Sequence, residues 1–163
     1  MAALRTAYEA RPHTGNMLKG RATLVDDEIV RLWHDCAMPA DAAVVAVGGY
    51  GRGELFPASD VDLLILLPKA ADAALQGKLS SLVSALWDMG LEIGHSVRTI
   101  DECLVAAADD ITVQTSLLEA RLLTGDGRLF ELLNSLFRDG LDLRTFYKEI
   151  GRASCRERVS SPV

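Results

Sequence analysis

Two aspartates in the stretch from Val47 to Leu67 are the residues best suited to chemistry. Asp60 and Asp62 are separated by one residue, and the apolar run that begins at Val61 is typical of a buried strand. Side chains alternate along a strand, so the two carboxylates point to the same face. Such a pair can bind one or two Mg²⁺ ions through oxygen ligands, and paired ions can clamp the attacking and leaving oxygens of a phosphoryl transfer.

A glycine-rich turn precedes the aspartates. It reads GGYGRG from Gly48 to Gly53 and follows a second apolar run, residues 42 to 47, which predicts another buried strand. Glycines let the backbone turn tightly and present N–H groups to phosphates, and the guanidinium of Arg52 can pair with a phosphate. The register fits neither a dinucleotide-binding fingerprint nor a P-loop. Alone, the turn would more often be a plain loop, but followed by paired acids it indicates a phosphate and metal site.

Glu92 is the candidate for a third acid. It lies between apolar residues in a third expected strand, residues 91 to 97. It is equally compatible with an exposed position on an edge strand, and both interpretations stand. On the same face, Gly94 would leave room for a ligand, and Arg98 could pair with a phosphate or with an acid.

These strands alternate with helical patterns, which predicts an α/β protein with a small sheet flanked by helices. The first helix is expected after a capping box of Thr23 and Asp26, and another after a capping box of Thr99 and Glu102. The expected helices span residues 23–36, 70–89, 99–107, 111–123 and 128–137.

Bulk properties set limits on the class of protein. The chain has 163 residues, enough for one domain, and its net charge of −6 argues against a sequence-independent nucleic-acid binder. No apolar run approaches a membrane span, and three widely spaced cysteines indicate reduced thiols in the cytoplasm. We expect an irregular lead or a frayed helix over 1–21 and one domain over 22–149. Residues 150–163 are rich in arginine and lack apolar periodicity, and we interpret them as a non-native tail, the rival interpretation being a genuine basic tail.

The motifs together resemble a known family. The stretch GGYGRGELFPASDVDLLIL is similar to that of the protein-PII uridylyltransferases, which belong to the nucleotidyltransferase superfamily with a DNA-polymerase-β-like fold. The stretches LWDMGLEIGHSVRT and SLLEARLLTGD resemble the same family in the same order, and the resemblance covers roughly residues 21 to 147. It implies a small mixed sheet flanked by helices.

The resemblance also implies roles. Asp60, Asp62 and Glu92 would bind Mg²⁺, and Glu92 would activate or orient the acceptor. The triphosphate would be cradled by Gly48, Gly49, Arg52, Gly53 and Ser59. The reaction would transfer UMP from UTP to a tyrosine hydroxyl of the PII signal protein and release pyrophosphate, with no nucleic acid and no membrane as partner.

Several alternatives stand beside this reading. Chains of the family are much longer and carry a second domain that removes uridylyl groups. We expect no such activity here, because the dipeptide His34-Asp35 is interpreted as part of an exposed helix face and not as a metal site. His95 is either part of an acceptor site or a structural residue. The rival functions are another nucleotidyltransferase such as an adenylyltransferase, a regulatory binding module, and an inactive truncated fragment.

Overall fold

A four-stranded mixed sheet forms the centre of the computed structural model, which describes residues 14–53, 55–57 and 59–141. The strands are β1 (Ala43–Ala46), β2 (Val61–Leu67), β3 (Ile93–Thr99) and β4 (Arg121–Gly125), in the order β3-β2-β1-β4. β1 pairs antiparallel with both β2 and β4, and β2 pairs parallel with β3. The predicted α/β class with a small mixed sheet is confirmed.

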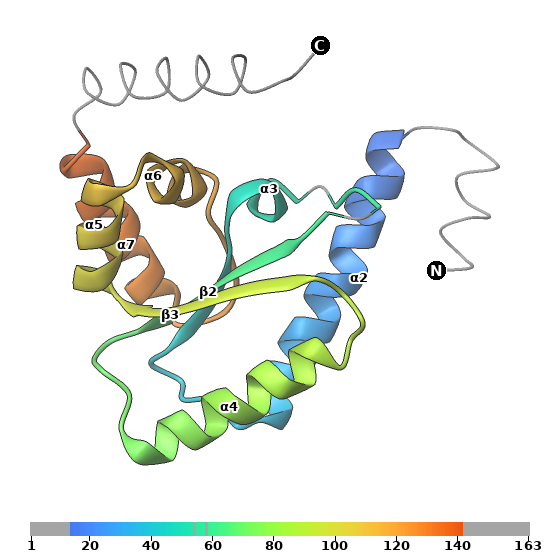
Figure 1. Cartoon of the computed structure of the whole chain (residues 1–163), viewed down its shortest axis with the longest axis horizontal. Coiled ribbons are helices and arrows are strands. Elements are labelled where there is room, and N and C mark those ends of the chain that lie inside the picture. Colours follow the sequence, from blue (N-terminus) through green and yellow to red (C-terminus); the bar gives the residue numbers. More distant parts are fainter. Residues whose placement is uncertain (1–13, 54, 58, 142–163) are drawn as a thin grey trace, which may run out of the picture.

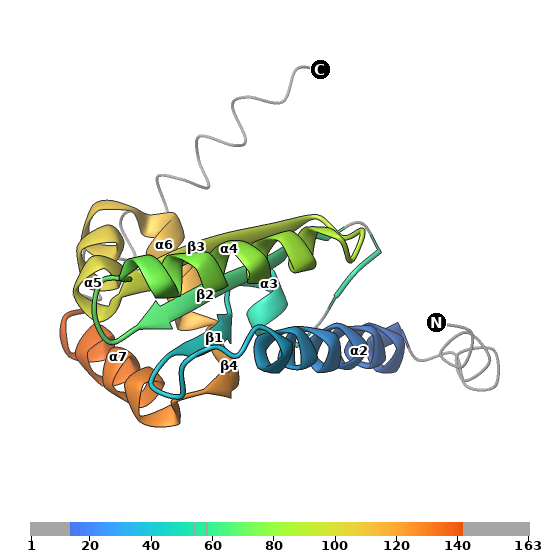
Figure 2. The ribbon, with the colours of Figure 1, turned by 90° about the horizontal axis from the view of Figure 1, so that it is seen from below.

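Helices cover both faces of this sheet (Figures 1 and 2). One face packs against α2 (Thr14–Asp35) and α4 (Ala73–Trp87). The other packs against α5 (Ile100–Asp109), α6 (Ile111–Leu118) and α7 (Gly127–Asp139). A single turn, α3 (Gly48–Gly51), lies between β1 and β2. In the part of the chain that the structure describes, no helix is both long and apolar enough to span a membrane.

Strand β2 is apolar at every position except Asp62, because both of its faces are covered. Val61, Leu63 and Ile65 belong to the core under α2 and α4. Leu64 and Leu66 belong to the core under α5, α6 and α7. Because side chains alternate along a strand, Asp62 lies on the same face as Leu64 and Leu66, yet it is exposed. The buried strand therefore holds an accessible carboxylate on a rigid element.

The predicted start of the first helix is wrong. α2 already runs from Thr14, so the expected lead is helical from that residue on, while residues 1–13 and the expected tail lie outside the described part. The Thr23 hydroxyl donates to the carbonyl oxygen of Lys19, as a threonine inside a helix does, and caps nothing. Asp26, its expected partner, instead binds a residue of β4.

The predicted helix over residues 111–123 is also only partly correct. α6 ends at Leu118, and the residues from Arg121 onward form β4. A short apolar run such as RLLT is compatible with either structure, and pairing with β1 decides it as a strand. The three predicted strands are confirmed, with β3 starting and ending two residues later than the expected span 91–97.

The capping box of α5 gives a first testable prediction. The Thr99 side chain accepts a hydrogen bond from the backbone N–H of Glu102, and the Glu102 carboxylate accepts one from the backbone N–H of Thr99. Thr99→Ala should therefore lower the free energy of unfolding by about 1 kcal/mol, measured by urea denaturation. Thr23→Ala is the matched control, since that threonine caps no helix and should be neutral or slightly stabilising. Equal losses in both variants would contradict the assignment.

Candidate active site

The carboxylate of Asp62 lies between two glycines. Gly94 is its partner across the parallel pair β2–β3, and a Cβ atom at Gly94 would lie 2.5 Å from Oδ1 of Asp62. Gly48 has φ +58°, and a Cβ atom there would lie 3.4 Å from Oδ2 of Asp62 and 3.7 Å from Oγ of Ser116. β3 and α3 can approach Asp62 this closely because neither glycine carries a side chain.

The charges of the two aspartates are mutually unfavourable. Partial burial of the carboxylate raises the pKa of Asp62, and the negative charge of Asp60 raises it further. Among the described residues, no side chain pairs with either carboxylate in an ion pair. Two neighbouring carboxylates without a cationic partner, one on β2 and one directly before it, are chemically suited to bind a divalent cation through oxygen ligands.

A cavity of about 350 Å³, here called the α3 cavity, opens on one side of Asp62. Its lining contains five of the residues predicted for the site: Gly49, Arg52, Ser59, Asp60 and Asp62. Tyr50 and Phe56 complete it. Gly48 borders Asp62, and Gly53, with φ +73°, closes the turn after α3 without lining the cavity.

The position of α3 is fixed by a contact with the end of α6. A Cβ atom at Gly51 would lie 2.0 Å from the carbonyl oxygen of Glu119, so backbone meets backbone here. Next to this contact, Arg52 forms an ion pair with the Glu119 carboxylate at 2.6 Å. The sequence predicts that Arg52 contacts a phosphate, but it gives no sign of Glu119 or of the need for glycine at position 51.

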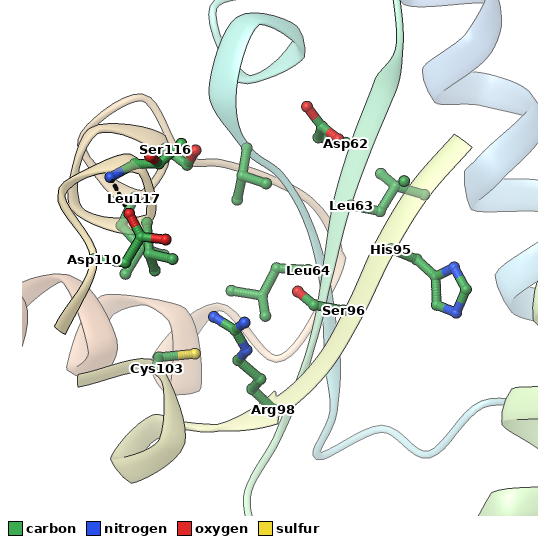
Figure 3. A pocket seen from close by; sticks show the side chains of 14 residues that line it. Asp62, Leu63, Leu64, His95, Ser96, Arg98, Cys103, Asp110, Ser116 and Leu117 are labelled. Carbon is green, nitrogen blue, oxygen red and sulfur yellow. Dashed lines mark hydrogen bonds between the residues drawn. The ribbon is translucent and has the colours of Figure 1, made fainter. Parts of the chain in front are cut away.

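A second cavity of about 390 Å³, here called the α6 cavity, also borders Asp62 (Figure 3). It is enclosed by β2, β3, α5 and α6, and its polar lining includes Asp62, Ser96, Arg98, Asp110 and Ser116. Asp62 is the residue common to the linings of the two cavities. The sequence singled out Arg98 for this face but gave no signal for Asp110 or Ser116, which lie far along the chain.

Glu92 and His95 lie outside the cluster of side chains around Asp62. Glu92 immediately precedes β3, its carbonyl oxygen accepts a hydrogen bond from the N–H of Val61 at 2.8 Å, and it lines neither cavity. Among the described residues, no three His, Cys, Asp or Glu side chains are grouped to hold a metal ion, so a role for Glu92 stays a prediction. The His95 ring points away from the α6 cavity and packs edge-on against Trp87, at 6.1 Å between centroids (Figure 3).

Comparison with known families agrees with this geometry. The model of the family described as "Nucleotidyltransferase domain" matches residues 27–116, which include the glycine turn, both aspartates and most of the α6 cavity. The chain belongs to the nucleotidyltransferase domain family. The matched region contains the paired carboxylates and the glycine turn, whose catalytic roles remain proposals.

Relatives of this nucleotidyltransferase domain are much longer proteins. A bifunctional uridylyltransferase/uridylyl-removing enzyme of Aromatoleum aromaticum is 62% identical over 89% of this chain and 17% of its own length. One of the same name from Ralstonia nicotianae is 50% identical over 86% of this chain and 16% of its own length. The chain thus spans about a sixth of these relatives. A chain in a crystal structure of a toxin–antitoxin with AMP-PNP is similar over 83% of this chain and 98% of its own, at 16% identity and TM-score 0.46.

Behind α3, a polar network joins distant parts of the nucleotidyltransferase domain. Arg121 of β4 donates to both carboxylate oxygens of Asp26 on α2, at 2.8 and 3.1 Å. The Tyr50 hydroxyl donates to the same carboxylate, and the guanidinium carbon of Arg121 lies 5.7 Å from the Tyr50 ring centroid. Burial, reinforced by Asp26, raises the pKa of Tyr50 far above its usual value and keeps it protonated. The network ties α2, α3 and β4 together.

Proposed function

We propose that this domain transfers UMP from UTP to a tyrosine hydroxyl of a PII signal protein, releases pyrophosphate and uses Mg²⁺. Nucleotidyl transfer follows from the family. The uridylyl group is favoured by the names of the relatives and by the resemblance of the GHSVRT segment, and the acceptor by the resemblance to the protein-PII uridylyltransferases. The observation that carries the proposal is the position of Asp62, which borders two separate cavities. Since UTP is made inside cells, the proposed compartment is the cytoplasm.

Asp60 and Asp62 would hold the magnesium ion, and their unpaired carboxylates suit it. When bound, the ion would neutralise charge on the phosphates. In the α3 cavity, Gly49 and Ser59 would offer polar hydrogens to the phosphate oxygens, and Arg52 would supply a planar cation. The triphosphate would thereby be oriented with its α-phosphorus next to Asp62.

In the proposed step, the phenolic oxygen of the acceptor attacks the α-phosphorus. The bond from that phosphorus to the bridging oxygen of the β-phosphate breaks, and pyrophosphate leaves with the bonding electrons. The phenolic proton is lost to water. Positioning and charge neutralisation would supply most of the rate increase, as is usual for phosphoryl transfer.

The test is incubation of the chain with radiolabelled UTP or ATP, Mg²⁺ and a purified PII protein. Label on PII from UTP, and none on PII whose acceptor tyrosine is changed to phenylalanine, supports the proposal. Label from ATP alone would favour an adenylyltransferase instead. No label from either nucleotide would contradict the proposed activity for this chain.

Arg52 provides a second prediction. Because it is expected to leave Glu119 and bind phosphate, Arg52→Ala should lower kcat/KM for UTP by about 10²-fold, the cost of losing one charge-stabilising group. Glu119→Gln is the matched control, since it removes the competing carboxylate and should leave the affinity for UTP unchanged or increase it. Steady-state rates at varied UTP would measure both effects. A weaker affinity for UTP in the Glu119 variant would contradict the expected exchange of partners.

A further inference from the structure

We propose that the α6 cavity receives the acceptor tyrosine and that Arg98 positions the acceptor by donating hydrogen bonds to oxygen atoms of the segment that carries it. This inference rests on the proposed function. It adds the place of the second substrate and a positioning residue for it.

The geometry of the displacement limits where the acceptor can bind. The attacking oxygen and the leaving oxygen are roughly in line on opposite sides of the phosphorus that is transferred. The α3 cavity is lined by Arg52 and Ser59, which are suited to the leaving pyrophosphate, and it borders Asp62. The attacking hydroxyl must then approach from outside the α3 cavity, and the α6 cavity is a separate cavity that also borders Asp62.

The shape and lining of the α6 cavity suit an aromatic hydroxyl side chain. Its volume of about 390 Å³ lies within the range of about 300–1,000 Å³ found for small-molecule sites. Apolar side chains that can pack against a ring come from both walls: Val47, Leu64, Val113 and Leu117. At the end next to Asp62, Gly94 leaves the floor without a side chain, and Ser116 offers a hydroxyl.

Arg98 is a cation in this cavity that forms no ion pair with the residues the structure describes. It lies on the same face of β3 as Gly94, four residues further along the strand, and Figure 3 shows its guanidinium inside the cavity beside Leu64. Its charge influences Glu102 and Asp110, but it is in no salt bridge among the described residues. A half-buried guanidinium with its planar set of N–H donors is suited to bind carbonyl or carboxylate oxygens of a ligand.

This arrangement places the nucleotide in the α3 cavity and extends the acceptor along β3. The tyrosine hydroxyl would lie at the Asp62 end, and the main chain that carries the tyrosine would lie toward Arg98. Arg98 would then contribute to the affinity for the acceptor and not to the affinity for UTP. A residue that merely stabilised the fold would affect both affinities together.

The experiment measures two affinities of the 163-residue chain separately. One is for a UTP analogue with a methylene group in place of the α–β bridging oxygen, in the presence of Mg²⁺. The other is for fluorescently labelled PII protein, by anisotropy, with that analogue saturating. The variants are Arg98→Ala, Arg98→Lys and, as a matched surface control, Arg138→Ala, whose side chain is exposed on α7.

Arg98→Ala should weaken binding of PII at least tenfold and change the affinity for the analogue by less than twofold. Arg98→Lys should fall between this variant and the unchanged chain, because lysine keeps the charge but loses the planar fork. Arg138→Ala should change neither affinity.

Three results would overturn the inference. They are unchanged binding of PII by both Arg98 variants, an equal loss of affinity for the analogue and PII, and no binding of PII by the unchanged chain. If the unchanged chain also failed to bind the analogue, the proposed function itself would be wrong. Binding of the analogue without an Arg98 effect on PII would contradict the inference alone.

Discussion

Asp62→Asn is expected to reduce nucleotidyl transfer by about 10²–10³-fold, the loss typical of removing one preorganised group that stabilises charge in the transition state. Asp62 is shared by both cavities, so it lies where the two substrates would meet. Asparagine keeps the size of the side chain and removes its negative charge, which weakens the hold on a divalent cation. Initial rates with labelled UTP, Mg²⁺ and PII measure the effect.

The same variant should fold at least as stably as the unchanged chain in metal-free buffer. The pKa of Asp62 in the folded state is raised above the ordinary value of 3.8, so the folded state binds the proton more tightly than the unfolded state. The contribution of Asp62 to stability is then present below pH 3.8 and declines as the pH rises through the raised pKa. At pH 7 the ionised carboxylate is therefore unfavourable, and asparagine relieves this cost.

Thermal melts in EDTA at pH 7 measure this difference. Asp139→Asn on α7 is a suitable control, because its exposed carboxylate lines neither cavity and should affect neither melting temperature nor rate substantially. Loss of transfer together with a lower melting temperature would mean that Asp62 supports the fold rather than the reaction. An unchanged rate of nucleotidyl transfer would mean that Asp62 is not part of the active site.

Gly51→Ala is expected to destabilise the chain by about 3 kcal/mol, the upper part of the usual range for overpacking. The new Cβ atom would lie 2.0 Å from the carbonyl oxygen of Glu119, 2.9 Å from its carbonyl carbon and 3.1 Å from the carbonyl oxygen of Ala46. All three are backbone atoms, so no side chain can rotate to make room. α3 would have to move away from α6, and the affinity for UTP should fall with it.

Gly77→Ala on α4 is the matched control for this substitution, since nothing lies within 4 Å of the added Cβ atom. It should stabilise the chain by about 1 kcal/mol through helix propensity. Urea denaturation of both variants gives the two free energies. A loss below 1 kcal/mol for Gly51→Ala would show that α3 and α6 can separate without cost.

The sequence predicted those parts of the structure in which local pattern and tertiary role agree. β2 has the bounds of its apolar run, because a strand covered on both faces needs apolar residues throughout. The paired aspartates face one cavity, as their spacing predicted. The capping box at Thr99 was recognisable because both of its hydrogen bonds are local.

The parts of the structure that the sequence did not predict depend on contacts between residues far apart in the chain. β4 exists because β1 has a free edge for it, and the residues of the run RLLT do not themselves distinguish strand from helix. The requirement for glycine at position 51 comes from Glu119, and nothing near Gly51 in the sequence reveals it. Likewise, parallel register places Gly94, and not Glu92, directly opposite Asp62.

The antiparallel pairing of β1 with β4 constrains the order in which the domain can assemble during synthesis on the ribosome. β1 and β2 can meet early, but Arg121 is 95 positions beyond Asp26, and closing so long a loop comes late. Until β4 has emerged, one side of β1 offers unpaired backbone groups to any neighbouring nascent chain. A ribosome that stalls before residue 121 therefore exposes an incomplete, aggregation-prone sheet. In that sheet the hydrogen-bonded pair of Asp26 and Tyr50 lacks its contact with Arg121.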